Sequence, residues 1–129
     1  MATETVRYGD FSELPGLPKI SKVVRHGDVV HTSGLVGEPG DDVAKQTREA
    51  LDRLDELLAV AGSDRSHILS AQVWLADMAD FDAHNEVWDQ WIDPENLPAR
   101  ACVGAQLYRP DILVEIRVIA TVITEGAER

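Results

Sequence analysis

Arginine, cysteine and glutamate occur together in residues 98–120, PARACVGAQLYRPDILVEIRVIA, and these residue types can carry chemistry. A guanidinium such as that of Arg100 can bind a carboxylate through two parallel hydrogen bonds. A carboxyl group such as that of Glu115 can hold a water molecule, accept its proton and return one. The thiol of Cys102 can line a pocket or, if it is activated, act as a nucleophile. Such a set is suited to binding a small anion and adding water to it.

Side-chain alternation predicts that two strands position these residues. Over residues 100–107 one face of the predicted strand is wholly apolar, and over residues 112–123 one face is again wholly apolar. Residues 108–111 supply proline and aspartate, which are typical of a turn. We therefore expect an antiparallel hairpin in which the two apolar faces coincide.

The register of this hairpin decides which side chains meet. The apolar faces coincide in one register that sets Cys102 opposite Arg117, and in another, slipped by two residues, that sets Cys102 opposite Glu115. In either register Arg100, Cys102 and Glu115 share one surface. In the alternative interpretation, Arg100 does not bind a substrate but forms a structural ion pair with Glu115. Arg117 could be the partner of Glu115 or the carboxylate clamp, and we favour a structural role for it.

Length and composition predict a single domain over residues 1–129, with residues 1–18 as an extended lead-in. One cysteine excludes an internal disulfide and fits a reducing compartment. We expect a cytoplasmic protein without a membrane span, because neither a signal-peptide pattern nor a long apolar run occurs. The net charge of -11 argues against a nucleic-acid partner. An anionic substrate then needs a local cation, which directs attention to Arg100.

Hydrophobic periodicity and turn signals predict the other elements. They are strands over residues 23–25 and 29–34, a helix from Asp41 or Asp42 to Gly62, a strand over residues 69–76, and a helix from Asp80 to Pro94. This order indicates an α+β domain with a mainly antiparallel sheet of about five to six strands and two helices on one face. The other face would expose apolar side chains such as Trp74 and Ile119, so we expect a partner subunit to cover it.

Four motifs together resemble the RidA/YjgF family over about residues 23–121. They are HTSG at residues 31–34, VWLADMADFDAHNEVW at 73–88, PARACV at 98–103 and VEIRVIA at 114–120. The resemblance implies a chorismate-mutase-like α+β fold and a homotrimer with a central barrel and sites at its subunit interfaces. It also implies that Arg100 binds a substrate carboxylate and that Glu115 holds or activates water, without a metal or organic cofactor.

The activity implied by this resemblance is hydrolytic deamination of reactive 2-enamino and 2-imino acids, such as 2-aminoacrylate, to 2-oxo acids and ammonia. This is 2-iminobutanoate/2-iminopropanoate deaminase chemistry. Cys102, Asn85, Ser33 and Ile20 fall at substrate-binding positions of the family. Ile20 stands where many deaminating members carry tyrosine, and Leu35 stands where a glutamine often follows Ser-Gly. Both departures make the pocket more apolar and bear on substrate identity.

Several residues also have plainer interpretations. We expect Cys102 to be a pocket thiol rather than a nucleophile, because no adjacent histidine activates it. Asn85 could pack a helix or an interface instead of contacting a ligand. Ser33 lies in a strand rather than a nucleophile elbow, which argues against serine hydrolase chemistry. We interpret all four histidines, which show no metal-ligand spacing, as structural or exposed: His26, His31, His67 and His84.

Two other functions remain open from sequence. One is a non-catalytic trimeric protein that binds small carboxylates and acts as a regulator. The other is a pathway-specific deaminase of a different substrate, such as an aminomuconate-type compound. Ribonuclease activity, a label that the family often carries, is not expected, because the strongly acidic charge balance disfavours RNA binding.

Overall fold

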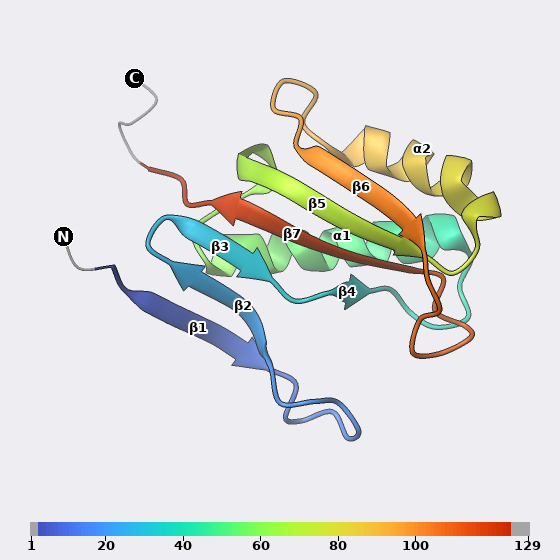
Figure 1. Cartoon of the computed structure of the whole chain (residues 1–129), viewed down its shortest axis with the longest axis horizontal. Helices are drawn as coiled ribbons and strands as arrows, with labels where there is room; N and C mark the ends of the chain where they lie inside the picture. Colours follow the sequence, from blue (N-terminus) through green and yellow to red (C-terminus); the bar gives the residue numbers. More distant parts are fainter. Residues whose placement is uncertain (1–2, 125–129) are drawn as a thin grey trace.

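The computed structural model describes residues 3–124, which form one seven-stranded sheet and two α-helices (Figure 1). The strands are β1 Thr5–Asp10, β2 Ser21–His26, β3 Val29–Thr32, β4 Leu35–Val36, β5 Ile68–Leu75, β6 Ala99–Gly104 and β7 Val114–Thr121. The helices are α1 Val43–Val60 and α2 Phe81–Trp91, with short 3-10 turns η1 Arg65–His67 and η2 Met78–Asp80. The segment expected as an extended lead-in thus contributes β1, an edge strand paired with β2.

The strand order is β1-β2-β3-β7-β5-β6, and β4 pairs with β7. All pairs are antiparallel except β5 with β6, which are joined through α2 and run parallel. Both helices lie behind the sheet in Figure 1, and no helix among residues 3–124 covers the face toward the viewer. The expected α+β architecture with two helices on one face is confirmed, with one or two more strands than predicted.

The predicted hairpin between residues 100–107 and 112–123 is wrong. β5 lies between β6 and β7, so these two strands do not pair with each other. The apolar face predicted for the first strand is also reversed, because Val103 is 46% exposed while Arg100 and Cys102 are partly buried on the helix side. The alternation of side chains shows which residues share a face of a strand. It does not show which strand lies next to it or which of its faces is covered.

The helix predicted from Asp41 or Asp42 to Gly62 is confirmed. Asp42 is the N-cap of α1 and its carboxylate accepts the backbone N–H of Lys45. Gly62 follows the helix with a φ of +83°, a conformation that favours glycine. One face of α1 packs on the sheet through Ala50, Leu51, Leu54 and Leu58, which are buried.

A buried glutamine on α1 ties the segment before β7 to the helix. The Gln46 amide nitrogen donates to the carbonyl oxygens of Asp41 and Asp111, and its oxygen accepts the backbone N–H of Leu113. The side chain has no exposed surface. These hydrogen bonds fix where the chain enters β7, and therefore where Glu115 lies.

The strand predicted over residues 69–76 is β5, with one local difference. The pairing of β5 with β7 shifts register between Ile68 and Ser70, so Leu69 is 52% exposed instead of joining Ala71 and Val73 in the core. No helix in the described part of the chain has the length and apolar character needed to span a membrane.

Candidate active site

Arg100 of β6 is held by three side chains of α2. Its Nη1 donates to Nε2 of His84 at 3.1 Å, and its Nη2 donates to Oδ1 of Asn85 at 2.6 Å. Its Cζ lies 4.9 Å from the centroid of the Trp88 ring, within the range of a cation–π contact. A guanidinium has five N–H donors, so three remain without a hydrogen-bond partner among residues 3–124. Those groups are available for an anion.

The helical repeat explains why α2 can hold the guanidinium. His84 and Trp88 are four residues apart and therefore lie on one face of the helix, and Asn85 is next to that face. His84, Val87 and Trp88 are buried against the rest of the domain. Asn85, which could have been a packing residue, instead binds the arginine that the sequence singled out.

His84 is a partner of Arg100 that the sequence interpretation missed. It is fully buried, and its Nδ1 lies 3.0 Å from Oγ1 of Thr47 on α1. Burial, together with the neighbouring Arg100, lowers the pKa of His84 to about 4. The ring is therefore neutral near pH 7 and can accept a hydrogen bond from the guanidinium. Helical spacing placed His84 with the aromatic residues, but the contact with β6 is not encoded in local spacing.

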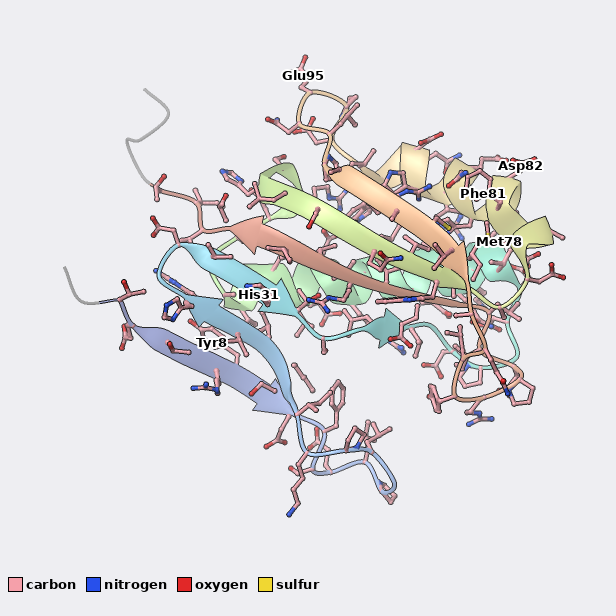
Figure 2. All side chains as sticks on the ribbon, in the orientation of Figure 1. Tyr8, His31, Met78, Phe81, Asp82 and Glu95 are labelled. Carbon is pink, nitrogen blue, oxygen red and sulfur yellow. The ribbon has the colours of Figure 1, made fainter. Side chains whose placement is uncertain are left out.

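Cys102 lies on the same face of β6, two residues from Arg100. Burial raises the pKa of its thiol, and the charge of Arg100 opposes that effect. A thiol that stays protonated is a weak nucleophile, which supports a pocket-lining role. Farther along β6, Gly104 lies near the side chain of Met78. Figure 2 shows Met78 and Phe81 at the same end of α2. Both side chains are exposed, at 44% and 38%.

Glu115 lies on the opposite face of the sheet. Arg100 pairs with Ala71 of β5, whereas Glu115 pairs with Trp74 of the same strand. Paired residues share a face and successive residues alternate, so positions three apart point to opposite sides. The prediction that Arg100, Cys102 and Glu115 share one surface is therefore wrong within a single chain. Nor do Arg100 and Glu115 form the ion pair considered as the structural alternative.

The carboxyl group of Glu115 sits against the backbone between β3 and β4. A Cβ atom on Gly34 would lie only 2.1 Å from Oε2 of Glu115, so this close approach requires glycine. Burial raises the pKa of the half-buried Glu115. The Oγ of the preceding Ser33 is buried and has no hydrogen-bond partner among the described residues. A carboxyl with a raised pKa is suited to holding water and exchanging a proton with it, and the Ser33 hydroxyl belongs to the residue next to Gly34.

The other predicted residues divide between the surface and the core. Arg117 is exposed on the Glu115 face and forms no ion pair within residues 3–124, so the structural pairing favoured for it is absent. It borders a hollow of about 560 Å³ that Trp74 and Ile119 also line. Ile20, directly before β2, is 43% exposed. Leu35 is 7% exposed and belongs to the core, so it does not make an open pocket more apolar.

Two half-sites result from this arrangement. The helix-side half-site consists of Arg100, Asn85 and Cys102, with His84 behind the arginine. The outer half-site consists of Glu115, Ser33 and Gly34. No group of three histidine, cysteine, aspartate or glutamate side chains in the described part of the chain is placed to hold a metal ion.

Comparison with known proteins agrees with this fold. The family described as Endoribonuclease L-PSP matches residues 13–122. A RutC family protein of Haemophilus influenzae is 42% identical over 80% of this chain and 90% of its own. The protein named 3-aminoacrylate deaminase RutC of Acinetobacter baylyi is 36% identical over 84% of this chain and 90% of its own.

A crystal structure of a YjgF family member from Neisseria meningitidis has a TM-score of 0.85 at 37% identity, and the match covers 94% of this chain and 97% of that one. With the motifs, the fold and these relatives in agreement, the chain belongs to the RidA/YjgF family, whose members also carry the names RutC and L-PSP.

Proposed function

We propose that this protein hydrolyses reactive 2-imino and 2-enamino acids to 2-oxo acids and ammonia. The observation that supports this proposal most is the state of Arg100, because its guanidinium is fixed in place and keeps three N–H donors for an anion. A carboxylate is the one fixed anion of such a substrate, and a planar guanidinium can bind it through two parallel bonds. The relative named 3-aminoacrylate deaminase supports chemistry on an enamine.

The proposed reaction acts on the imine form, which a 2-enamino acid reaches when a proton moves from nitrogen to its C3 carbon. It begins when Arg100 binds the substrate carboxylate and so orients the adjacent C=N carbon toward water held by Glu115. Glu115 accepts a proton as the water oxygen bonds to that carbon, and the C=N electron pair moves to nitrogen. Glu115 then returns the proton to nitrogen. In the carbinolamine that results, Glu115 accepts the proton of the new hydroxyl group and passes it to nitrogen. The C–N bond then breaks, ammonia leaves, and the oxygen retained on carbon becomes the carbonyl of the 2-oxo acid. General acid–base help of this kind contributes about a hundred- to ten-thousand-fold.

The opposite faces of Arg100 and Glu115 mean that one copy cannot supply both groups to one substrate. We therefore propose that the site forms between two copies in a homotrimer. One subunit would contribute Arg100, Asn85 and Cys102, and its neighbour would contribute Glu115 and Ser33. The outer face carries half-buried apolar side chains, including Trp74 and Ile119, and no helix within residues 3–124 covers it. A neighbouring subunit on that face would bury this apolar surface.

The test couples the purified protein to a serine or threonine dehydratase and follows the decay of the released intermediate. We expect the wild-type protein to accelerate this decay. Arg100→Ala should lose about a hundredfold or more in kcat/KM, because two charge-assisted hydrogen bonds are lost. Arg48→Ala, on the exposed face of α1, is the matched control and should keep wild-type activity. Absence of acceleration by the wild type, or full acceleration by Arg100→Ala, would contradict the proposal.

A non-catalytic carboxylate-binding protein is the second candidate. It is supported by the observation that Arg100 and the side chains that hold it belong to one chain, whereas Glu115 lies on the other face. In this case the wild-type protein would bind pyruvate but would not accelerate imine decay. Glu115→Gln would then leave pyruvate affinity unchanged, with no turnover to lose.

A further inference from the structure

A line of hydrogen-bonded side chains runs from α1 through α2 to β6. Thr47 Oγ1 lies 3.0 Å from His84 Nδ1, and His84 Nε2 lies 3.1 Å from Arg100 Nη1. We propose that His84 is a positioning residue, which holds the Arg100 guanidinium in the orientation that binds the substrate carboxylate. This inference rests on the carboxylate-binding part of the proposed function.

The direction of each hydrogen bond follows from the chemistry of the groups. A guanidinium has donors only, so Nε2 of His84 must accept from Arg100. In a neutral imidazole the other nitrogen then carries the proton, so Nδ1–H donates to Thr47. His84 has no exposed surface, so its ring meets protein groups rather than solvent. Arg100 thus selects the tautomer, and the Thr47 hydroxyl can accept the Nδ1–H that this tautomer presents.

Three contacts define the plane of the guanidinium. His84 accepts at Nη1, Asn85 accepts at Nη2, and the Trp88 ring lies 4.9 Å from Cζ. A free arginine side chain would lose its rotamer freedom on binding a ligand, whereas Arg100 has already lost it on folding. We therefore expect His84 to act on affinity, through preorganisation, rather than on the chemical step.

Of the side chains that contact the guanidinium, only His84 can take up a proton near pH 4 and so change from a hydrogen-bond acceptor to a donor. Burial and Arg100 together lower its pKa to about 4. Arg100 of β6 is the charged group that contacts the ring, the Cys102 thiol lies on the same face of β6 as Arg100, and α1 contributes the uncharged Thr47. A protonated ring would direct an N–H at the guanidinium and break the contact.

The first test measures the dissociation constant for pyruvate at neutral pH. His84→Leu keeps an apolar volume but has no acceptor, so the constant should rise about tenfold. The amide oxygen of His84→Gln can accept where Nε2 does, and affinity should return to within about threefold of the wild type. His67→Gln is the matched control, because the His67 side chain of η1 hydrogen-bonds to Asp64 and to none of Thr47, His84 and Arg100. It should leave affinity unchanged.

In the imine assay, His84→Leu should raise KM by the same factor and change kcat by less than about twofold. A folded His84→Leu protein with wild-type pyruvate affinity would overturn the role of His84 and leave the proposed function standing. A wild-type protein that binds no pyruvate would overturn both. A wild-type protein that binds pyruvate but does not hydrolyse the imine would overturn only the deaminase, and the affinity comparison would still decide the role of His84.

Two measurements decide the matter even if His84→Leu does not fold. Nitrogen-15 NMR of the wild-type histidines should show His84 neutral with its proton on Nδ1 at pH 7, and a proton on Nε2 would overturn the inference. Pyruvate affinity should fall in the wild type as the pH approaches 4 but should not fall in His84→Gln. An equal fall in both proteins would assign the titration to another group and contradict the inference.

Discussion

Arg100 and Glu115 lie on opposite faces of the sheet, on strands that β5 separates. The two groups proposed to bind the carboxylate and to handle the proton therefore belong to different half-sites. The proposed site between subunits would reconcile this geometry with hydrolytic chemistry, and the first prediction tests it directly.

The first prediction concerns mixed oligomers of Arg100→Ala and Glu115→Gln. Each variant alone should be inactive. If the two groups come from neighbouring copies, random mixing should restore both intact groups in one site out of four, or about a quarter of wild-type activity. The two variants are refolded or co-expressed together, and imine hydrolysis is measured. A mixture no more active than either variant alone would mean that both groups come from one copy.

The second prediction separates the two candidate carboxylate clamps. Arg117→Ala should change the pyruvate dissociation constant by less than about twofold, because Arg117 is exposed and lacks the contacts that orient Arg100. Arg100→Ala should raise the constant about a hundredfold. Calorimetric titration of both variants gives the comparison. The reverse ranking would make Arg117 the clamp.

The third prediction uses the contact between Gly34 and Glu115. Gly34→Ala places a methyl group 2.1 Å from the present position of Oε2, so the carboxyl must move. We expect kcat to fall about tenfold or more while pyruvate affinity stays within about twofold, because Arg100 is untouched. Gly104→Ala is the control, since its methyl group would meet Met78 at 3.4 Å, an ordinary contact. Equal kcat values for the two variants would mean that Glu115 does not take part in the reaction.

The fourth prediction concerns stability and pH. The pKa of His84 is about 4 in the folded protein and about 6.5 in the unfolded chain. Between these values the unfolded chain binds more protons, so the free energy of unfolding falls as the pH falls through this window. The loss amounts to roughly 3 kcal/mol. Glu115 acts in the opposite sense, because its raised pKa gives a stabilisation that is lost as the pH rises.

Urea unfolding of the wild type and of His84→Gln, between pH 7 and pH 4, measures this contribution. The midpoint of the wild type should fall more steeply than that of the variant. His67→Gln, a substitution at a partly exposed histidine, should keep the wild-type slope. If all three proteins show the same slope, His84 is not the group that titrates.

Short-range sequence patterns were sufficient to predict several of the helices and strands of this protein. Asp42 and Gly62 define α1 because capping and a left-handed glycine act within a few residues. The β2–β3 hairpin follows in the same way from the turn at Gly27. Each motif that identifies the family is a short run of the sequence, and one of them contains Arg100, the candidate anion-binding residue.

The tertiary structure alone decided which strands are neighbours and which face each one buries. β5, distant in sequence from β7, takes the place expected for β6, because the crossover through α2 brings β6 to the outer edge of β5. That crossover also supplies His84 and Asn85 as partners for Arg100, so a polar face turns inward and Val103 turns outward. Strand alternation has a period of two and carries no information about the partner strand. The separation of Arg100 from Glu115 therefore depends on long-range packing, which no local pattern encodes.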